Sequence, residues 1–302
     1  MKILFIIIIN LLISQDAPFF DGDLAYKYLK EQCDIGPRFP GSEGHSLTKK
    51  YFEKYLINKC HKLEIMDEKV KHPFTNNLVD LTNLMARFYP DRDNRIMFMA
   101  HWDTREIADM DPIESNRDKP ILGANDGASG IAILMVLAEI LNNYPLNNIG
   151  VDLLFLDGED MGKSGDASGF GLGTLEFTKN MPLPLPKYAI CLDMVADAQP
   201  SFKIEQFSFQ QAPWLVRKVW NLANNLGYSE FENKFGSAVY DDHRVLYLNS
   251  GIPSIDIIDF EYPNADTNYW HTLNDIPENC SPRTLEIVGT VVTNLIFIED
   301  SE

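Results

Sequence analysis

Three carboxylates crowd into four positions directly after an apolar run, in the segment Leu154–Gly162 (LFLDGEDMG). They are Asp157, Glu159 and Asp160. Negative charges this close repel one another, whereas a bound divalent cation attracts the acid that coordinates it. Two explanations are open: a solvated turn, or half of a metal site in which one acid coordinates and its neighbour acts as a base. Asp157 itself is expected to be structural and to accept N–H groups of the turn.

Similar residues follow other apolar runs. RIMFMA runs into His101 and Asp103, YAICL runs into Asp193, Asp126 precedes an apolar helical pattern, and His271 lies in a late loop. Taken singly, each has an ordinary structural explanation, such as a helix N-cap for Asp126. Ligands of open α/β sheets, however, collect beyond the carboxyl ends of the strands. Two histidines and several carboxylates converging there form a nitrogen-and-oxygen ligand set suited to Zn²⁺.

An alternation of strands and helices must position these residues. The apolar, β-type runs predict strands at Lys62–Val70, Leu81–Phe88, Arg95–Ala100, Val151–Leu156, Tyr188–Val195 and Pro253–Phe260. Helical patterns predict helices at Asp21–Asp34, Ser42–Cys60, Gly127–Tyr144, Ala212–Gly227 and Pro282–Ile298. Several strands are nearly continuous apolar runs, which is typical of strands covered on both faces. The sequence therefore predicts an α/β fold with a sheet layered between helices. No linker divides the chain, so residues 15–302 are expected to form a single domain.

The charge balance excludes some partners. The 302 residues include 26 Lys and Arg against 44 Asp and Glu, for a formal net charge of −18. Nucleic-acid binders gain affinity by neutralising phosphates, so this composition argues against a nucleic-acid partner. It also offers no basic surface for an anionic membrane, so no stable membrane partner is implied. Hard cations and cationic amines remain compatible with the acidic balance.

The amino-terminal stretch MKILFIIIINLLISQD has one Lys followed by an apolar run from Ile3 to Ile13. This length fits the h-region of a signal peptide and is too short to span a bilayer. Residues 1–14 are therefore expected to be a signal peptide, or an uncleaved anchor, of an exported periplasmic or secreted protein. Cys33 and Cys60 could pair after export, and no C-x-x-C motif indicates a thiolate zinc site.

Six motifs, HWD, GANDGASG, DGED, LDM, DDH and WHT, resemble those of the co-catalytic zinc aminopeptidase clan in order and approximate spacing. Within this clan they are most similar to the glutaminyl-peptide cyclotransferases, particularly the exported bacterial-type glutaminyl cyclases. The resemblance begins near Tyr26, with YLKEQCDIGPRFPGSEGH, and covers nearly all of the chain that follows. It implies a three-layer α/β/α sandwich with a twisted, mostly parallel central sheet.

The resemblance also implies roles for individual residues. Asp126, Asp160 and His271 match the three ligands of the cyclase's single zinc, and Glu159 matches its general acid/base. The family's second ligand is often Glu, so Asp160 is one methylene shorter and its reach is altered. The Gly-rich segment GKSGDASGFGLG that follows is expected to shape the pocket.

Three further residues match the surroundings of the substrate in this family. Asp193 and Asp241 match a pair of acids in the hydrogen-bond network beside the substrate, and Trp270 matches an aromatic wall of the pocket. Asp241 is also expected to bond Asp193 and so draw it away from a second metal ion.

The implied reaction is the cyclisation of N-terminal glutamine of peptides or proteins to pyroglutamate, with release of ammonia. The alternative is a two-zinc aminopeptidase that hydrolyses N-terminal residues. All five of its ligand positions are present: His101, Asp126, Asp160, Asp193 and His271. One zinc is therefore expected for the cyclase and two for the aminopeptidase, with His101 and Asp193 as the candidate ligands of the second ion. A non-catalytic binding protein would be expected to have broken ligands, and none is broken. Oligomeric state stays open.

Overall fold

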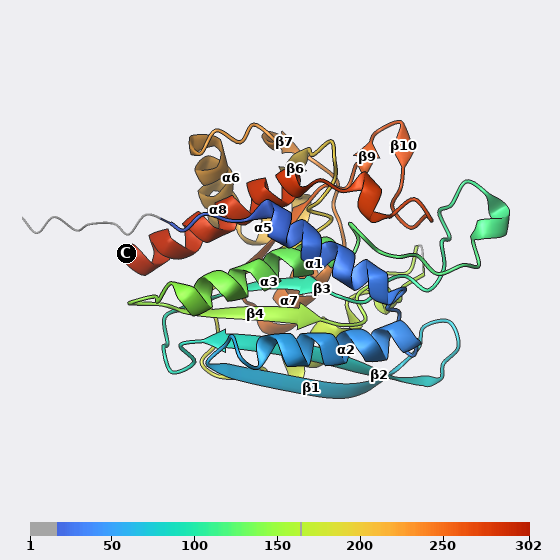
Figure 1. The fold of residues 1–302 in the computed structure, drawn as a ribbon, viewed down its shortest axis with the longest axis horizontal. Helices are drawn as coiled ribbons and strands as arrows, with labels where there is room; N and C mark the ends of the chain where they lie inside the picture. Colours follow the sequence, from blue (N-terminus) through green and yellow to red (C-terminus); the bar gives the residue numbers. More distant parts are fainter. Residues whose placement is uncertain (1–16, 164) are drawn as a thin grey trace, which may run out of the picture.

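The computed structural model describes residues 17–163 and 165–302 (Figure 1). The predicted signal peptide, residues 1–14, lies outside the described residues. The centre of the molecule is a six-stranded sheet with the strand order β1-β2-β4-β3-β5-β8. Its strands are β1 (Lys62–Lys71), β2 (Leu78–Phe88), β3 (Arg95–His101), β4 (Gly150–Leu156), β5 (Ala189–Asp193) and β8 (Ser254–Ile258). The four strands β4, β3, β5 and β8 run parallel. At one edge, β2 pairs antiparallel with β4, and β1 pairs antiparallel with β2.

Helices cover both faces of this sheet. One face packs against α1 (Gly22–Ile35), α2 (Glu43–Leu56), α3 (Ala128–Asn143), α6 (Pro213–Asn225) and α8 (Pro282–Ser301). Figure 1 shows α1, α3 and α8 together above the strands. The other face packs against α4 (Leu172–Lys179) and α7 (Asp242–Ser250). Alternate residues of β3 serve the two faces: Phe98 belongs to the first core, and Met97 and Met99 to the second. This arrangement confirms the predicted α/β/α sandwich.

Shorter elements complete the fold. They are α5 (Gln206–Gln211), the strand pairs β6 (Phe202–Ile204) with β7 (Phe231–Phe235) and β9 (Pro263–Asn264) with β10 (Thr267–Asn268), and 3₁₀ turns at Glu114–Asn116, Ala167–Gly169 and Pro277–Asn279. The predicted long helices and strands all form, with ends shifted by a few residues. The four cysteines are free, so the possible pairing of Cys33 with Cys60 is not formed. Within the described part of the chain, no helix is both long and apolar enough to cross a membrane.

The connections around β3 create a place for a ligand. The chain leaves β3 through α3, on one face, and returns in β4 on one side of β3. It then leaves β4 through α4, on the other face, and returns in β5 on the opposite side of β3. A crevice opens beyond the carboxyl ends of strands at such a switch point. Close packing of α3 depends on Gly130, because a Cβ there would lie 2.0 Å from the carbonyl oxygen of Leu192 in β5.

Candidate metal centre and active site

A cavity of about 390 Å³ opens at the switch point. This volume is within the range of small-molecule sites. All seven residues predicted for the cyclase site line it: Asp126, Glu159, Asp160, Asp193, Asp241, Trp270 and His271. They come from the loops after β3, β4 and β5, from the start of α7, and from the loop between β10 and α8. The sequence prediction that these distant segments converge is therefore met by the fold.

The first cluster consists of Asp126, Asp160 and His271. Nε2 of His271 lies 3.2 Å from Oδ1 of Asp160 and 3.6 Å from Oδ2 of Asp126. Both carboxylates are almost fully buried, yet Oδ2 of Asp126 and Oδ2 of Asp160 accept no hydrogen bond. Buried carboxylate oxygens without a partner are costly unless a cation satisfies them. One imidazole nitrogen and carboxylate oxygens at this spacing therefore fit a Zn²⁺ ion.

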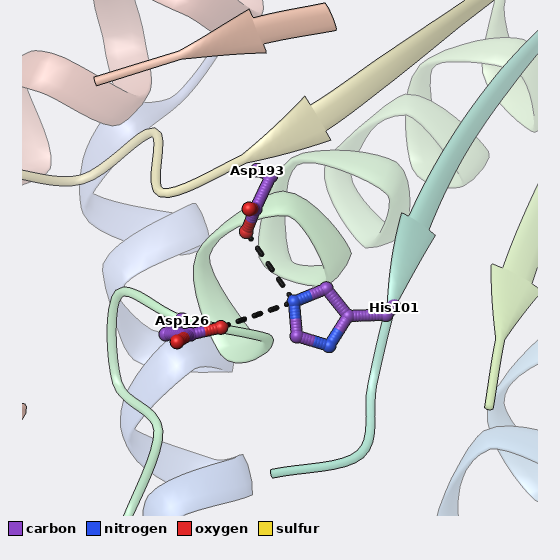
Figure 2. A group of neighbouring side chains, drawn as sticks. All are labelled: His101, Asp126 and Asp193. Atoms are coloured by element: carbon purple, nitrogen blue, oxygen red, sulfur yellow. Dashed lines mark hydrogen bonds and ion pairs between the residues drawn. The ribbon is translucent and has the colours of Figure 1, made fainter. Parts of the chain in front are cut away.

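The second cluster shares Asp126 with the first (Figure 2). Nε2 of His101 lies 3.2 Å from Oδ1 of Asp126 and 3.3 Å from Oδ1 of Asp193. Asp126 thus turns one oxygen toward each histidine. Burial alone would lower the pKa of His101, but hydrogen bonds to Asp103, Asp126 and Asp193 raise it well above its ordinary value. The ligand geometry is consequently compatible with one cation or with two.

The side-chain carboxylate of Asp126 does not hydrogen-bond to the main chain at the start of α3. The carboxylate of Asp275 accepts the backbone N–H groups of Asn125 (2.7 Å) and Asp126 (3.2 Å). Helix α3 starts only at Ala128, after Gly127 with φ = 102°, and no side chain caps it. The explanation of Asp126 as an N-cap is therefore wrong, because the positive φ of the glycine separates this residue from the helix.

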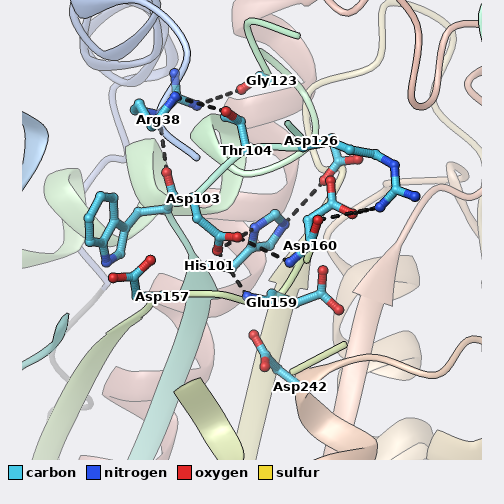
Figure 3. Close-up of polar contacts among 12 residues, drawn as sticks. Arg38, His101, Asp103, Thr104, Gly123, Asp126, Asp157, Glu159, Asp160 and Asp242 are labelled. Atoms are coloured by element: carbon cyan, nitrogen blue, oxygen red, sulfur yellow. Dashed lines mark hydrogen bonds and ion pairs between the residues drawn. The ribbon is translucent and has the colours of Figure 1, made fainter. Parts of the chain in front are cut away.

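Asp103 fixes the two adjacent acids after β4 (Figure 3). Its two carboxylate oxygens accept the backbone N–H groups of Glu159 (3.0 Å) and Asp160 (3.1 Å). With the main chain held in this way, the side chain of Asp160 faces His271, while that of Glu159 lines the cavity. The charge crowding in DGED thus serves a site rather than a solvated turn. The sequence places Asp103 just after an apolar run, but it predicts no role for this residue.

Asp157, the first acid of DGED, is structural, but its partners differ from the prediction. Its Oδ2 accepts the backbone N–H of Thr82 in β2 at 2.6 Å and lies 2.8 Å from Nε2 of His45 in α2. The His45 ring in turn stacks on Trp102 at 4.5 Å between centroids. The turn N–H groups after Asp157 are instead taken by Asp103, so the expected local bonds do not form.

Arg105 and Asp109 support both the acid and the imidazole of the first cluster. Nη1 of Arg105 donates to Oδ1 of Asp160 at 2.8 Å, and its Nε and Nη2 donate to the two oxygens of Asp109, each at 2.7 Å. Asp109 lies 3.5 Å from Nδ1 of His271. Burial would raise the pKa of Asp160, but the charges of His271 and Arg105 hold it below its ordinary value. Both residues lie in the segment REIAD, where sequence analysis assigned no site.

Arg38 ties two loops of the site together from the opposite side. This fully buried guanidinium donates to the carbonyl oxygens of Trp102, Leu122 and Gly123 (Figure 3). The backbone N–H of Arg38 donates to Oγ1 of Thr104. Both ends of the connection between β3 and α3, which carries Asp126, the residue shared by the two clusters, are thus fastened to the segment GPRFPG.

Burial and neighbouring charges shift the pKa values of the acids that line the cavity. Burial and the nearby charge of Asp241 raise the pKa of Glu159 well above its ordinary value, against the opposing charge of His101. Burial raises the pKa of Asp193 to about 7, even though its hydrogen bond to His101 lowers it. Asp241 caps α7 and accepts the N–H of Asp242. The predicted bond between Asp241 and Asp193 does not form, since Asp193 turns to the imidazole instead.

Trp270 forms an aromatic wall. Its ring stacks on that of His271, with centroids 3.6 Å apart, and lies 5.1 Å from the centroid of Phe260. His271 adopts φ = 57°, a left-handed conformation that is uncommon for a residue with a side chain. Stacking and strained backbone together fix the direction of the imidazole. The predicted pocket-shaping loop after β4 also lines the cavity, through Gly165, Asp166, Ala167 and Phe170.

Comparison with known proteins places the chain in a family. Residues 83–296 match the family model described as Peptidase family M28. Since this match covers more than half of the sequence, the chain belongs to peptidase family M28. No match was found among curated proteins.

Solved structures narrow the likeness further. A glutaminyl cyclase from Bacteroides thetaiotaomicron, bound to N-acetylhistamine, is 33% identical with a TM-score of 0.88. A glutaminyl cyclase from Tannerella forsythia is 34% identical with a TM-score of 0.87. A Zn-dependent exopeptidase from Parabacteroides distasonis is 32% identical with a TM-score of 0.88. Each likeness covers 93% of this chain and 99% of the other.

Proposed function

We propose that this protein is a zinc-dependent glutaminyl-peptide cyclotransferase. It converts the N-terminal glutamine of peptides or proteins to pyroglutamate and releases ammonia. One observation carries the proposal. Glu159, an acid whose pKa is raised, lines the same cavity as the ligand set of Asp126, Asp160 and His271. The chain that builds this cavity is about one third identical to two glutaminyl cyclases over nearly its whole length.

The metal would be held by Asp126, Asp160 and His271, whose buried oxygens without partners fit a cation. When bound there, zinc supplies Lewis-acid polarisation of the carbonyl group of the glutamine side chain. The remaining steps concern residues of the chain. Arg105 and Asp109 keep one oxygen of Asp160 and the ring of His271 in direction. Partners of this kind increase metal affinity by orienting the ligands.

Glu159 carries the proton in this mechanism. The α-amine of the substrate attacks its own side-chain carbonyl carbon, and the carboxylate of Glu159 takes one proton from the attacking nitrogen. The same proton is then given to the departing amide nitrogen, which leaves as ammonia while the lactam C–N bond stays. A base whose pKa lies near the working pH is best suited to such a transfer. Burial raises the pKa of Glu159 well above its ordinary value.

Asp193, Asp241 and Trp270 bind and orient the substrate. The two carboxylates accept N–H groups of the side-chain amide, and the indole face packs against the methylene groups of glutamine. Because the attack is intramolecular, the enzyme mainly has to hold the folded conformation in which amine and carbonyl meet.

The alternative is a two-zinc aminopeptidase. The cluster of His101, Asp126 and Asp193 favours it, because its ligand atoms lie as close together as those of the first cluster (Figure 2). We nevertheless propose one zinc per chain. Arg105 donates to the ligand Asp160 and to Asp109, which in turn lies 3.5 Å from the ligand His271. The second cluster has only a contact of 3.5 Å between His101 and Asp103.

A direct test compares two substrates on the purified protein after dialysis. The proposal expects ammonia release from a glutaminyl peptide, no amine release from a leucyl amide, and about one zinc per chain by elemental analysis. Glu159→Gln should keep its zinc and lose about 10²- to 10⁴-fold in kcat, the usual contribution of a general acid/base. Glu176→Gln, at an exposed ion pair with Lys179, is the control. Amine release with two zinc ions, or an active Glu159→Gln, would reject the assignment.

We also propose that the protein is exported, to the periplasm or the medium, with residues 1–14 as its signal peptide and residues 15–302 as one catalytic domain. The support is the apolar amino-terminal run and the lack of a linker in the sequence. Mass spectrometry of the protein recovered from cell fractions tests this, since an intact amino terminus in the cytoplasmic fraction would contradict export.

A further inference from the structure

His243 lies fully buried beneath the cavity, in the first turn of α7, and the mechanism above does not use it. Its two ring nitrogens face carboxylates on opposite sides. Nε2 lies 3.1 Å from Oε2 of Glu205, and Nδ1 lies 3.6 Å from Oδ2 of Asp241, which lines the cavity. A buried imidazole between two acids can orient one of them from the other.

Glu205 is the fixed end of this chain of contacts. Its Oε1 accepts the backbone N–H groups of Phe207 (2.8 Å) and Val239 (3.0 Å). Its Oε2 accepts the N–H (2.5 Å) and the hydroxyl (2.7 Å) of Ser208 in addition to the contact with His243. Three backbone N–H groups and one hydroxyl thus hold the two oxygens. Such a carboxylate is held in one place and in its charged form.

A third acid, Asp256 of β8, also faces Nδ1 of His243, at 3.8 Å. Burial raises the pKa of Asp256 well above its ordinary value, and the charge of Asp241 raises it further. Burial acts in the same direction on Asp241, but the neighbouring imidazole of His243 lowers the pKa below the ordinary value. Asp241 is also the nearer of the two acids to Nδ1, a buried nitrogen that has no hydrogen-bond partner among the described residues and faces Asp241 at 3.6 Å.

Asp241 needs such a constraint. Its Oδ1 accepts the N–H of Asp242 as the cap of α7, and its Oδ2 accepts the thiol of Cys191 at 3.3 Å. A thiol is a weak donor, so it alone would not fix the second oxygen. The imidazole, whose Nδ1 lies 3.6 Å from this oxygen, is placed to hold the plane of the carboxylate toward the cavity.

We infer that Glu205 and His243 are positioning residues for the reaction: Glu205 anchors His243, whose Nδ1–H orients the Asp241 carboxylate toward the substrate amide. This inference rests on the proposed cyclase function. It assigns work to the third residue of the DDH motif, which contacts neither the substrate cavity nor a candidate ligand of either metal cluster.

Two substitutions separate the two ring nitrogens. His243→Asn keeps an N–H donor near the position of Nδ1, toward Asp241, and gives up the contact with Glu205. His243→Gln keeps a donor near the position of Nε2, toward Glu205, and gives up the contact with Asp241. Tyr188→Phe, which removes a buried hydrogen bond to Glu299 at the other end of β5, is a control for loss of stability alone.

The measurements are kcat and KM with a glutaminyl peptide, zinc content, and thermal unfolding. We expect His243→Gln to lose about 10- to 100-fold in kcat, the usual effect of an outer hydrogen-bond partner, with KM and zinc content unchanged. His243→Asn should recover most of this loss even though it is the less stable of the two. A structural role alone predicts the reverse order, with activity following stability. Equal kcat in His243→Gln and Tyr188→Phe would overturn the inference.

A crystal structure of His243→Gln gives a readout that does not depend on turnover. The carboxylate of Asp241 should rotate away from the cavity, and an unchanged carboxylate would overturn the inference as well. If the wild-type protein released no ammonia from any glutaminyl peptide, the proposed function would fail. The orientation of Asp241 in the crystal structure of His243→Gln would still decide the role of His243.

Discussion

The substitution Asp103→Asn tests how the site orients its two adjacent acids. A single carboxylate accepts the N–H groups of two consecutive residues, of which Asp160 is a candidate zinc ligand and Glu159 the proposed base. Asparagine has nearly the same shape but only one acceptor oxygen, since its other terminal group is an NH₂ donor. One of the two backbone N–H groups must therefore lose its acceptor and face a donor instead.

The size of the effect follows from the lost bond. Hydrogen bonds to a charged group contribute about 1.5–3 kcal/mol, and the partner left behind is fully buried. Since about 1.4 kcal/mol corresponds to a factor of ten, kcat/KM or the zinc affinity should fall about 10- to 100-fold. If the oxygen of Asn stays on Asp160, the loss falls on kcat/KM with zinc affinity kept. If it stays on Glu159, zinc affinity falls.

The assay measures both quantities: kcat/KM from ammonia release, and zinc affinity from competition with a chelator. The matched control is Asp300→Asn, because the carboxylate of Asp300 also accepts backbone N–H groups, those of Asn147, Asn148 and Ile149, but at the opposite end of the sheet. The control should lose stability without losing activity or zinc. If Asp103→Asn kept both kcat/KM and zinc affinity within twofold of wild type, the argument that Asp103 orients the two acids would be refuted.

Two further predictions concern the metal support and the thiols. Arg105→Met should weaken zinc binding by about 10- to 100-fold in a chelator competition, because it removes the partner of Asp160 and leaves Asp109 as an uncompensated acid. Arg105→Lys should lie between, since an ammonium cannot donate to both acids in a fork; full affinity in that variant would contradict the role of the guanidinium. With a thiol reagent at pH 8, the native protein should react at Cys60 alone, because Cys60 is partly exposed whereas the other three thiols are buried. Burial raises the pKa of Cys60 as well, but it raises that of Cys33 to about 12 and those of Cys191 and Cys280 well above their ordinary values. In urea all four should react, and fewer than four would reveal a disulfide.

Much of the site could be predicted from the sequence because His101, Asp126, Glu159, Asp160 and Asp193 lie close to long apolar runs. Such runs become central strands, and the carboxyl ends of parallel strands meet at one edge. The position of Asp193 at the end of β5 or His101 at the end of β3 is thus nearly determined by hydrophobic pattern. His271, by contrast, lies in a late loop with no apolar run beside it, and its role as a zinc ligand was predicted from the likeness of WHT to a known motif.

The contacts that orient these residues could not be predicted in the same way. Arg105 meets Asp160 across 55 positions of sequence, and Asp109 meets His271 across a larger gap, through a loop whose path no periodic pattern fixes. Asp157 shows the same limit. Its charge suggested hydrogen bonds within its own turn. Instead, its carboxylate accepts the backbone N–H of Thr82 in strand β2. Short helices such as α4 and α7 were missed because a single turn or two gives little periodicity.

The acids of the site fall into two groups, and this division explains how one cavity can both bind a cation and move a proton. Asp160 and Asp241 each have a cationic neighbour, Arg105 or His243, and the pKa of each is lowered against the effect of burial. Glu159 has no hydrogen-bonded cation, so burial dominates and its pKa is raised. When environments push neighbouring carboxyl groups apart in pKa, the low one serves as a charged ligand or acceptor and the high one as the proton carrier. The adjacent pair in DGED therefore divides into a ligand and a base because the charges of His271 and Arg105 lower the pKa of the second acid, whereas burial raises that of the first.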